Sequence, residues 1–336
     1  MMKLNDLFKN TSYEDTLFSE EAILAVESAV FMKNVKNVDM PYIKCLIRDK
    51  EIKLTPEEAI RQLYIYKLIH EYDYPISRIQ LETPIHFGRE VKRADITIMD
   101  KDRPLVPYII VELKKPKLTD GKEQLKSYCN ATGAPIGVWT NGEQVSCYNR
   151  KDPNFFEMIS DIPKASQKLS DILNEKYTYD DLRSRDKISK EKRSLRNLIK
   201  EMEDEVLASA GVDSFEEIFK LIFAKLYDEL ICANDKTVFL QFRNSGDTDF
   251  ELKEKIQKLF DDAKKKWEGV FPEESKILLS PSHLAVCVST LQDIKLFNNN
   301  LDVVDGAFEY LMSKAQKGEK GQYFTPLWIC DGKLQE

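Results

Sequence analysis

The sequence lacks the features that would place the chain in a membrane or in a secretory pathway. No apolar run approaches the ~20 residues that a transmembrane helix needs, and the first residues, MMKLNDLFKN, show no apolar core of a signal peptide. The six cysteines are scattered without a C-x-x-C pair, so zinc spacing is absent and a disulfide framework is not expected. We therefore predict a cytoplasmic protein with free thiols and no membrane partner.

Two further absences narrow the chemistry. No Walker A sequence, G-x-x-x-x-G-K-[ST], occurs, which excludes ATP-driven translocation by this chain. The histidines at positions 70, 86 and 283 form no pair with metal-ligand spacing, and we expect them to be structural or surface residues.

What is present is typical of a globular protein of two domains. The chain has 336 residues, of which 42% are hydrophobic and 10% aromatic. Its net charge of −7 does not indicate a nucleic-acid binder, but residues 183–200 carry eight basic and two acidic side chains. This stretch is interpreted first as a solvated helix start and linker, and second as a contact to the DNA backbone through Arg193 and Arg196.

Residues 50–150 carry the signals of a compact α/β unit. A helix is predicted from Thr55, a good N-cap that is followed by Pro56 and, three residues after the cap, by Glu58. Three strands, a second helix and a hairpin with Asn141-Gly142 at its turn follow, over 76–88, 93–100, 107–115, 120–132 and 136–149. This order predicts a mixed sheet flanked by helices.

From about residue 166 onward the pattern is nearly all helical. Helices are predicted over 193–211, 214–234, 250–270 and 300–315, and the middle two have the apolar spacing of a helical bundle. The polar stretch 176–190 favours a linker. The predicted fold class is thus α/β plus all-α. The expected domains are 1–165, a linker over 166–190, and a helical domain over 191–336.

The stretch IIVELKKPK, residues 109–117, begins as a buried strand and then becomes charged. Because side chains alternate across a strand, Glu112 and Lys114 share a face while Leu113 points the other way. If the strand that carries Asp95 pairs with it, Asp95 and Glu112 face one edge of the sheet. Two carboxylates in apolar surroundings are costly unless a cation neutralises them, and Mg²⁺ prefers oxygen ligands. A Glu-x-Lys alone is more often an ordinary surface feature.

The surroundings of this tripeptide add a resemblance to a known family. Asp95, the Glu112-x-Lys114 pair and Gln124-x-x-x-Tyr128 occur in this order on the expected elements. The arrangement resembles the N-terminal nuclease domain of type I restriction enzyme R subunits, in a Gln-x-x-x-Tyr branch of the PD-(D/E)xK superfamily. It covers roughly residues 50–150, and Gln124 and Tyr128 share one helix face. One departure is that an alanine, not the nominal proline, precedes Asp95.

The resemblance implies hydrolysis of a DNA phosphodiester that depends on Mg²⁺, with Mn²⁺ as an alternative. Asp95 and Glu112 would hold the metal together with the backbone carbonyl of Leu113. Lys114 would orient or polarise the attacking water and offset developing charge.

The resemblance also implies supporting residues around this centre. Gln124 and Tyr128 would shape the site or contact the DNA backbone. An acid on the first helix can complete such sites; Glu58 is preferred over Glu57, with simple N-terminal capping as an equal alternative. The expected phosphate contacts are Lys114, Lys115, Lys117 and Arg93.

Near the end of the chain, the string GQYFTP resembles the entry motif of adenine DNA methyltransferases, the M subunits of type I systems. There this segment, here Phe324, Thr325 and Pro326, helps to bind S-adenosylmethionine. The alternative is an ordinary loop before a helix. No glycine-rich cofactor loop follows and no Asn/Asp-Pro-Pro-aromatic motif occurs, so this chain is expected to be a truncated or partial protein without methyltransferase activity.

Two functions of different classes follow. The first is a restriction endonuclease module, acting on double-stranded DNA and fused to the start of a methyltransferase. It would work with a specificity subunit, or with missing methyltransferase and target-recognition domains. The second is a non-catalytic DNA-binding or assembly fragment. The first requires a divalent cation at Asp95 and Glu112, whereas the second does not.

Overall fold

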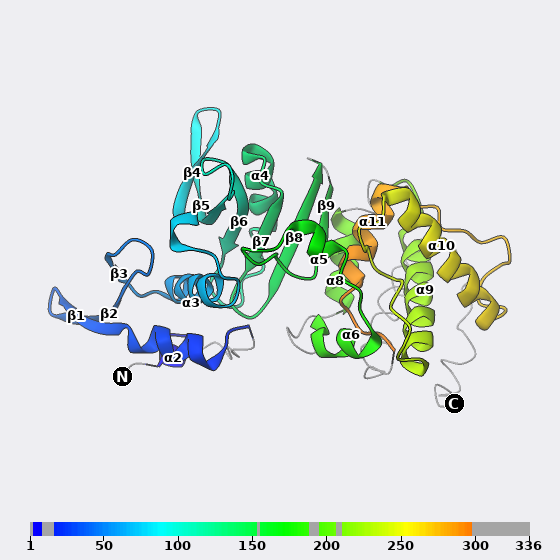
Figure 1. The fold of residues 1–336 in the computed structure, drawn as a ribbon, viewed down its shortest axis with the longest axis horizontal. Helices are drawn as coiled ribbons and strands as arrows, with labels where there is room; N and C mark the ends of the chain where they lie inside the picture. Colours follow the sequence, from blue (N-terminus) through cyan, green and yellow to red (C-terminus); the bar gives the residue numbers. More distant parts are fainter. Residues whose placement is uncertain (1–2, 9–16, 153–154, 188–194, 206–209, 298–336) are drawn as a thin grey trace. The chain divides into compact units, whose positions relative to one another are not determined.

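The structure is a computed structural model that describes residues 3–8, 17–152, 155–187, 195–205 and 210–297. The chain divides into two compact units, Met1–Asn174 and a second unit that begins at Glu175. Figure 1 labels most helices and strands of both. Each unit is described by itself.

The first unit has two sheets and several helices. Its elements are α1 (Leu4–Leu7), α2 (Glu20–Ser28), β1 (Val30–Val35), β2 (Val38–Lys44), β3 (Glu51–Lys53), α3 (Pro56–His70), η1 (Ile76–Arg78), β4 (Ile79–Phe87), β5 (Glu90–Met99), β6 (Pro107–Leu113), α4 (Lys122–Thr132), β7 (Ile136–Thr140), β8 (Val145–Asp152), β9 (Phe155–Ile159) and α5 (Leu169–Leu173).

The larger sheet has six strands in the order β4-β5-β6-β7-β8-β9. Strands β6 and β7 are parallel, and the other neighbours are antiparallel, so the sheet is mixed. Ile109 and Val111 share a core cluster with Leu63 of α3, whereas Ile110 shares one with Leu125 of α4. Because side chains alternate along β6, α3 and α4 cover opposite faces of this sheet.

Local sequence signals account for the helix and the hairpin that frame the sheet. The side chain of Thr55 accepts a hydrogen bond from the backbone N–H of Glu58, which caps α3. Between β7 and β8, Asn141 accepts hydrogen bonds from the N–H groups of Glu143 and Gln144, and Gly142 has a φ of 85°. The predicted helix and hairpin are both confirmed, and the hairpin loop spans 141–144.

The described residues of the second unit form helices joined by loops, and they contain no strand. Its helices are α6 (Tyr179–Arg185), α8 (Leu195–Glu205), α9 (Ser214–Asn234), α10 (Asp249–Lys266) and α11 (Pro281–Leu291). Aromatic side chains fill the space between α9 and α10: Phe223 lies edge-on to Trp267 and Phe271, with ring centroids 5.5 and 5.2 Å apart.

The fold class predicted from the sequence is confirmed: a mixed sheet flanked by helices, followed by a helical region. The segment expected as a linker, 166–190, differs, because its described part contains α5 and α6 and buries Tyr177 and Leu182. The helix expected over 300–315 lies outside the described residues. Within the described part of the chain, no helix has both the length and the apolar character needed to cross a membrane.

Candidate active site

Strand pairing brings the two expected metal-binding acids together. Antiparallel β5 and β6 pair Ile96 with Val111, so Asp95 and Glu112 follow on adjacent strands at the same level. Asp95 Oδ2 accepts a hydrogen bond of 2.7 Å from the backbone N–H of Leu113, which fixes the carboxylate against β6. The sequence prediction that these acids share one end of the sheet is therefore realised in the structure.

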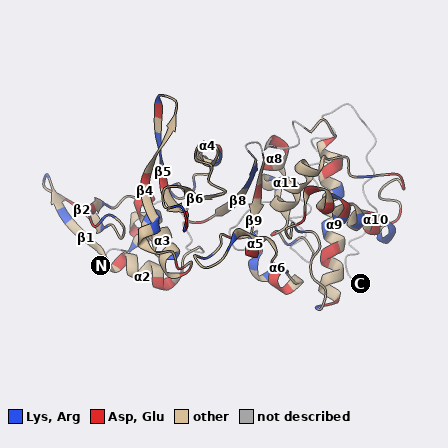
Figure 2. Cartoon of the chain, turned by 45° about the horizontal axis from the view of Figure 1, so that its top comes forward, with Lys and Arg blue, Asp and Glu red and all other residues tan. Residues whose placement is uncertain are grey.

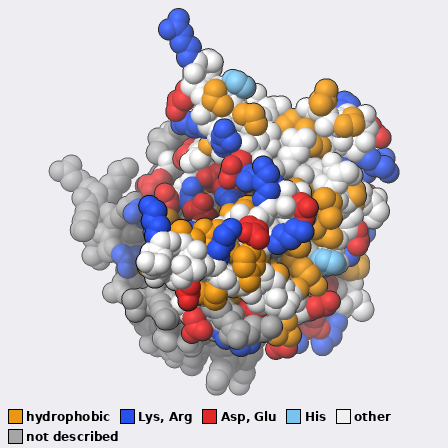
Figure 3. Space-filling view, turned by 90° about the vertical axis from the view of Figure 1, so that its left-hand side faces the viewer, with side chains coloured by type: hydrophobic (Ala, Val, Ile, Leu, Met, Phe, Trp, Pro, Cys, Tyr) orange, Lys and Arg blue, Asp and Glu red, His pale blue; other side chains and the backbone are white. Residues whose placement is uncertain are grey.

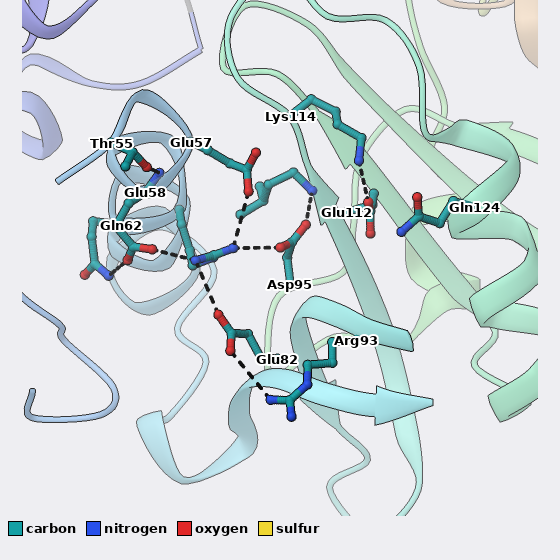
Figure 4. A network of polar contacts seen from close by, with 12 residues as sticks. Thr55, Glu57, Glu58, Gln62, Glu82, Arg93, Asp95, Glu112, Lys114 and Gln124 are labelled. Atoms are coloured by element: carbon teal, nitrogen blue, oxygen red, sulfur yellow. Dashed lines mark hydrogen bonds and ion pairs between the residues drawn. The ribbon is translucent and has the colours of Figure 1, made fainter. Parts of the chain in front are cut away.

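Arg61 of α3 holds two of the site's carboxylates. Its Nη2 donates to Asp95 Oδ1 at 2.7 Å, and its Nη1 donates to Glu58 Oε2. Gln62 donates to the other oxygen of Glu58 at 2.7 Å. Figure 4 shows Glu57, Glu58, Glu82 and Asp95 converging on this region from α3, β4 and β5. A buried guanidinium thus neutralises the acid pair that lies on the α3 side.

Glu112 is the least satisfied acid of the group. Its Oε1 accepts a hydrogen bond from Lys114 Nζ at 2.7 Å, but Oε2 is buried without a partner among the described residues. Burial, and then repulsion from Asp95, raise the pKa of Glu112 to about 7, although Lys114 acts in the opposite direction. Burial opposes the charge of Lys114, yet its hydrogen bond to Glu112 raises the pKa of the ammonium. Glu112 is therefore a buried acid with one oxygen that accepts no hydrogen bond from the described residues.

Gly121 makes room for Lys114. This glycine caps α4 with a φ of 95°, a left-handed conformation that side chains disfavour. A Cβ at this position would lie 2.4 Å from Cε of Lys114 and 3.1 Å from its Nζ. The loop before α4 is thus shaped around the lysine of the Glu-x-Lys pair.

Helix α4 supplies the glutamine and the tyrosine that the sequence singled out. Gln124 donates a hydrogen bond to the hydroxyl of Tyr128. Burial raises the pKa of Tyr128, and the charges of Glu112 and Asp95 add to this effect while Gln124 and Lys114 oppose it. Gln124 lies beside Glu112 in Figure 4.

The donors fit a divalent cation that keeps water ligands. In the described part of the chain, no three His, Cys, Asp or Glu side chains form a group that could hold a metal. Asp95 and Glu112 provide two carboxylates, and Oε2 of Glu112 is a buried acceptor for which the described part of the chain supplies no donor. Mg²⁺ commonly binds through one or two carboxylates and several waters, so this donor set matches its chemistry.

The two acids at the start of α3 differ in burial and in hydrogen bonding. Both oxygens of Glu58 accept hydrogen bonds from Arg61 and Gln62, so Glu58 reaches Asp95 only through Arg61. Glu57 is partly exposed, and its charge contributes to the raised pKa of Glu112. Glu57 also pairs with Arg61, at 3.8 Å, so both acids contact the same guanidinium, and Glu58 as the acid that completes the site stays a prediction.

Some of the residues expected to contact DNA are exposed, and others lie outside the described residues. Lys115, Lys117 and Arg196 are exposed, and Lys117 forms an ion pair of 3.2 Å with Glu143. Arg196 lies on α8 of the second unit. Arg193 and the GQYFTP residues Phe324, Thr325 and Pro326 lie outside the described residues.

Sequence reasoning missed three residues of the site: Arg61, Gly121 and Glu82. Arg61 had a readable signal, because it follows Glu57 and Glu58 at i+4 and i+3 on one predicted helix. Gly121 and Glu82 had no such signal. The role of Gly121 depends on the space that Lys114 occupies, and that of Glu82 on an irregularity in β4. Neither can be read from the sequence.

One comparison with known proteins, a family model that matches part of the first unit, bears on the candidate site. A search of curated proteins found no match. Among solved structures, a putative nuclease belonging to DUF820 from Anabaena variabilis ATCC 29413 is similar, with 15% identity, 50% of this chain and 89% of that chain covered, and a TM-score of 0.24. Residues 56–163, which contain every acid of the site together with Lys114, Gln124 and Tyr128, match the family described as type I restriction enzyme R protein N terminus (HSDR_N).

Proposed function

We propose that the first unit is a metal-dependent DNA endonuclease module of a restriction system. The observation that carries this proposal is the buried Glu112, which lies next to Asp95 and Lys114. Its second oxygen accepts no hydrogen bond from the residues that the structure describes. The match of residues 56–163 to restriction enzyme R proteins supports DNA as the substrate. The function would be the restriction of foreign DNA.

Each residue has a role that its contacts support. Asp95, oriented by Arg61 and by the N–H of Leu113, and Glu112 would hold Mg²⁺ or Mn²⁺, with the carbonyl of Leu113 as a further oxygen donor. When bound, the cation supplies Lewis-acid activation of water and phosphate. Lys114 donates to the attacking water or to a phosphate oxygen, because its other ammonium hydrogens have no acceptor among the described residues.

The second unit would belong to a methyltransferase neck in a longer parent protein. This part of the proposal rests on GQYFTP alone, and the family match ends at residue 163, before the second unit begins. S-adenosylmethionine would bind only with the domains that complete that enzyme.

A plasmid assay tests the endonuclease. Supercoiled DNA is incubated with the full chain in Mg²⁺ or in EDTA, and nicked and linear products are counted. We expect cleavage in Mg²⁺ only, and a loss on the order of 10²- to 10³-fold in Asp95→Asn and Lys114→Ala. Lys114→Ala should still bind the metal. Glu123→Gln, an exposed carboxylate on α4, is the control that should cleave normally.

The opposite results would identify the non-catalytic alternative. Cleavage that is absent in Mg²⁺ and Mn²⁺, with DNA binding retained, would mean that the site is idle. Full activity in Asp95→Asn would remove the assignment of the site.

A further inference from the structure

A strand irregularity places one more carboxylate beside the site. Strand β4 pairs Leu81 with Ile96 and Thr83 with Ala94, and Glu82 lies between these pairs, opposite Asp95. Its φ is 52°, in the left-handed region that non-glycine residues rarely adopt within a strand. Such conformations persist only where the surroundings enforce them, and they concentrate at functional sites.

Three arginines from separate elements surround the Glu82 carboxylate. Arg48, in the turn between β2 and β3, lies 3.4 Å from it; Arg93 of β5 lies at 3.8 Å and Arg61 of α3 at 3.9 Å. Arg61 is already paired with Asp95 and Glu58 at shorter distances. For Arg48 and Arg93, Glu82 is the only ion-pair partner within the described residues.

This arrangement leaves the two outer arginines weakly neutralised. Two guanidinium groups share one carboxylate, and distances of 3.4 and 3.8 Å exceed the roughly 2.7–2.9 Å of a charge-assisted hydrogen bond. The side chain of Glu82 is 39% exposed and that of Arg93 is 68% exposed, so water reaches both. The contacts are therefore loose enough to exchange for those of a better acceptor.

A phosphodiester has the chemistry that these arginines select. The guanidinium fork donates two parallel hydrogen bonds to phosphate oxygens, and Arg is the preferred side chain for this geometry. The outer end of the β4–β5 hairpin carries further Lys and Arg (Figure 2). On the face shown in Figure 3, acidic and basic side chains are interleaved and do not form one continuous basic field. A phosphate would thus meet a local arginine pair beside acids.

We propose that Arg48 and Arg93 form a subsite for a backbone phosphate of DNA next to the catalytic acids. Glu82 occupies this subsite in the free protein, and the phosphate displaces its carboxylate. This inference rests on the proposed function for the identity of the nucleic acid. It assigns Glu82 a restraining role: the residue keeps the two arginines in position and lowers the affinity for DNA until a phosphate replaces it.

A binding experiment without catalysis tests the subsite. The full chain is titrated into a fluorescein-labelled DNA duplex in EDTA, and anisotropy is recorded over a series of salt concentrations. Glu82→Gln should bind about 5-fold tighter, because both arginines are released from their acid. Arg48→Gln and Arg93→Gln should each bind about 5- to 10-fold weaker at low salt and lower the slope of log K against log salt by about 1.

Matched controls separate the subsite from net charge. Glu90→Gln removes an acid from the same hairpin and releases Lys92, its partner at 3.5 Å. Arg103→Gln removes an exposed arginine that pairs with Asp100. The proposal is supported if Glu82→Gln and the Arg48 and Arg93 variants change the affinity clearly more than these controls. Equal effects in variant and control would overturn it, and so would weaker DNA binding by Glu82→Gln.

The binding measurement also separates the phosphate subsite from the proposed endonuclease function. Tighter binding by Glu82→Gln together with an inactive wild type would keep the subsite and reject the proposed function. Cleavage by the wild type together with unchanged DNA binding by all three variants would keep the proposed function and reject the subsite. Arg93 is a surface residue, so we expect Arg93→Gln to fold even if Glu82→Gln does not. In that case the salt dependence of DNA binding by Arg93→Gln tests the subsite alone.

Discussion

The two units each contain a buried glutamate that is paired with a lysine, and the pairs differ in what surrounds them. In the first unit, Lys114 donates to Glu112 at 2.7 Å; in the second, Lys220 donates to Glu217 at 2.8 Å. Both glutamates are almost completely buried. By the distance between their charges alone, the two pairs are the same interaction.

The second oxygen of each carboxylate separates them. Glu217 Oε2 accepts hydrogen bonds from the backbone N–H groups of Leu278 and Leu279, at 2.9 and 3.2 Å. Lys220 also donates to the carbonyl of Lys276 and contacts Glu216. Glu112 Oε2 has no partner among the described residues. The pair in the second unit is saturated and joins a loop to α9, whereas the pair in the first unit is an incomplete set of donors and acceptors, which is what a ligand site requires.

The largest expected difference concerns stability under one matched substitution. Glu217→Gln should lower the free energy of unfolding by about 2–3 kcal/mol, because it removes one charge of a buried, hydrogen-bonded pair. Glu112→Gln should cost little or stabilise the protein at neutral pH, because it removes an acid that burial and Asp95 disfavour. Chemical denaturation of both variants measures this. Similar losses in the two would erase the distinction between the pairs.

A smaller effect is expected from the glycines that flank α4. Gly121→Ala should reduce cleavage by about 10- to 100-fold, because its Cβ collides with Lys114 and displaces the ammonium. Gly133→Ala is the matched control: its φ of 79° is also left-handed, but a Cβ there meets no atom within 4 Å. Both should lose some stability, and only the first should lose turnover per folded molecule. Equal rates in the two variants would show that the position of Lys114 is not set by Gly121.

The smallest effect is a dependence of the free energy of unfolding on pH in the metal-free protein. The pKa of Glu112 is raised from 4.5 to about 7, so the folded protein holds this proton more tightly than the unfolded chain does. The protonated Glu112 contributes fully to the free energy of unfolding below about pH 4.5, and this contribution is lost as the pH rises through about 7. The loss amounts to roughly 1–3 kcal/mol. Denaturation in EDTA at pH 5 and pH 8 should show this decrease in the wild type, and a smaller one in Glu112→Gln. An unchanged difference would place the titrating group elsewhere.

Sequence patterns predicted the parts of the fold that depend on local signals. The Thr55 cap, the strand around Glu112 and the Asn141-Gly142 hairpin were all readable, because caps, alternation and turn residues act over a few positions. The same signals were present but not used at α11, where Ser280 accepts from the N–H of His283 and Pro281 follows the cap. The sheet β1-β2-β3 was not predicted, since its exposed, mixed strands lack a clear period.

The parts of the site that could not be predicted depend on contacts between distant segments. The acids Asp95 and Glu112 were singled out by the resemblance to a nuclease family, and the alternation of side chains along their two strands was consistent with it. The convergence of Arg48 and Arg93 on Glu82 could not be found, because it requires the left-handed residue in β4 and the turn after β2 to meet in space. The number of hydrogen-bond partners of Glu112 likewise depends on how the chain packs around it, and the spacing of residues in the sequence does not reveal it.

Counting the bound cations shows whether Asp95 and Glu112 form a metal site. Electron paramagnetic resonance of Mn²⁺ titrated into the full chain should show about one ion per chain, held mainly by Asp95 and Glu112. Glu112→Gln should abolish this binding, whereas Glu217→Gln should retain it in the folded protein. A wild type that binds no Mn²⁺, or a Glu112→Gln variant that binds it as the wild type does, would contradict the account.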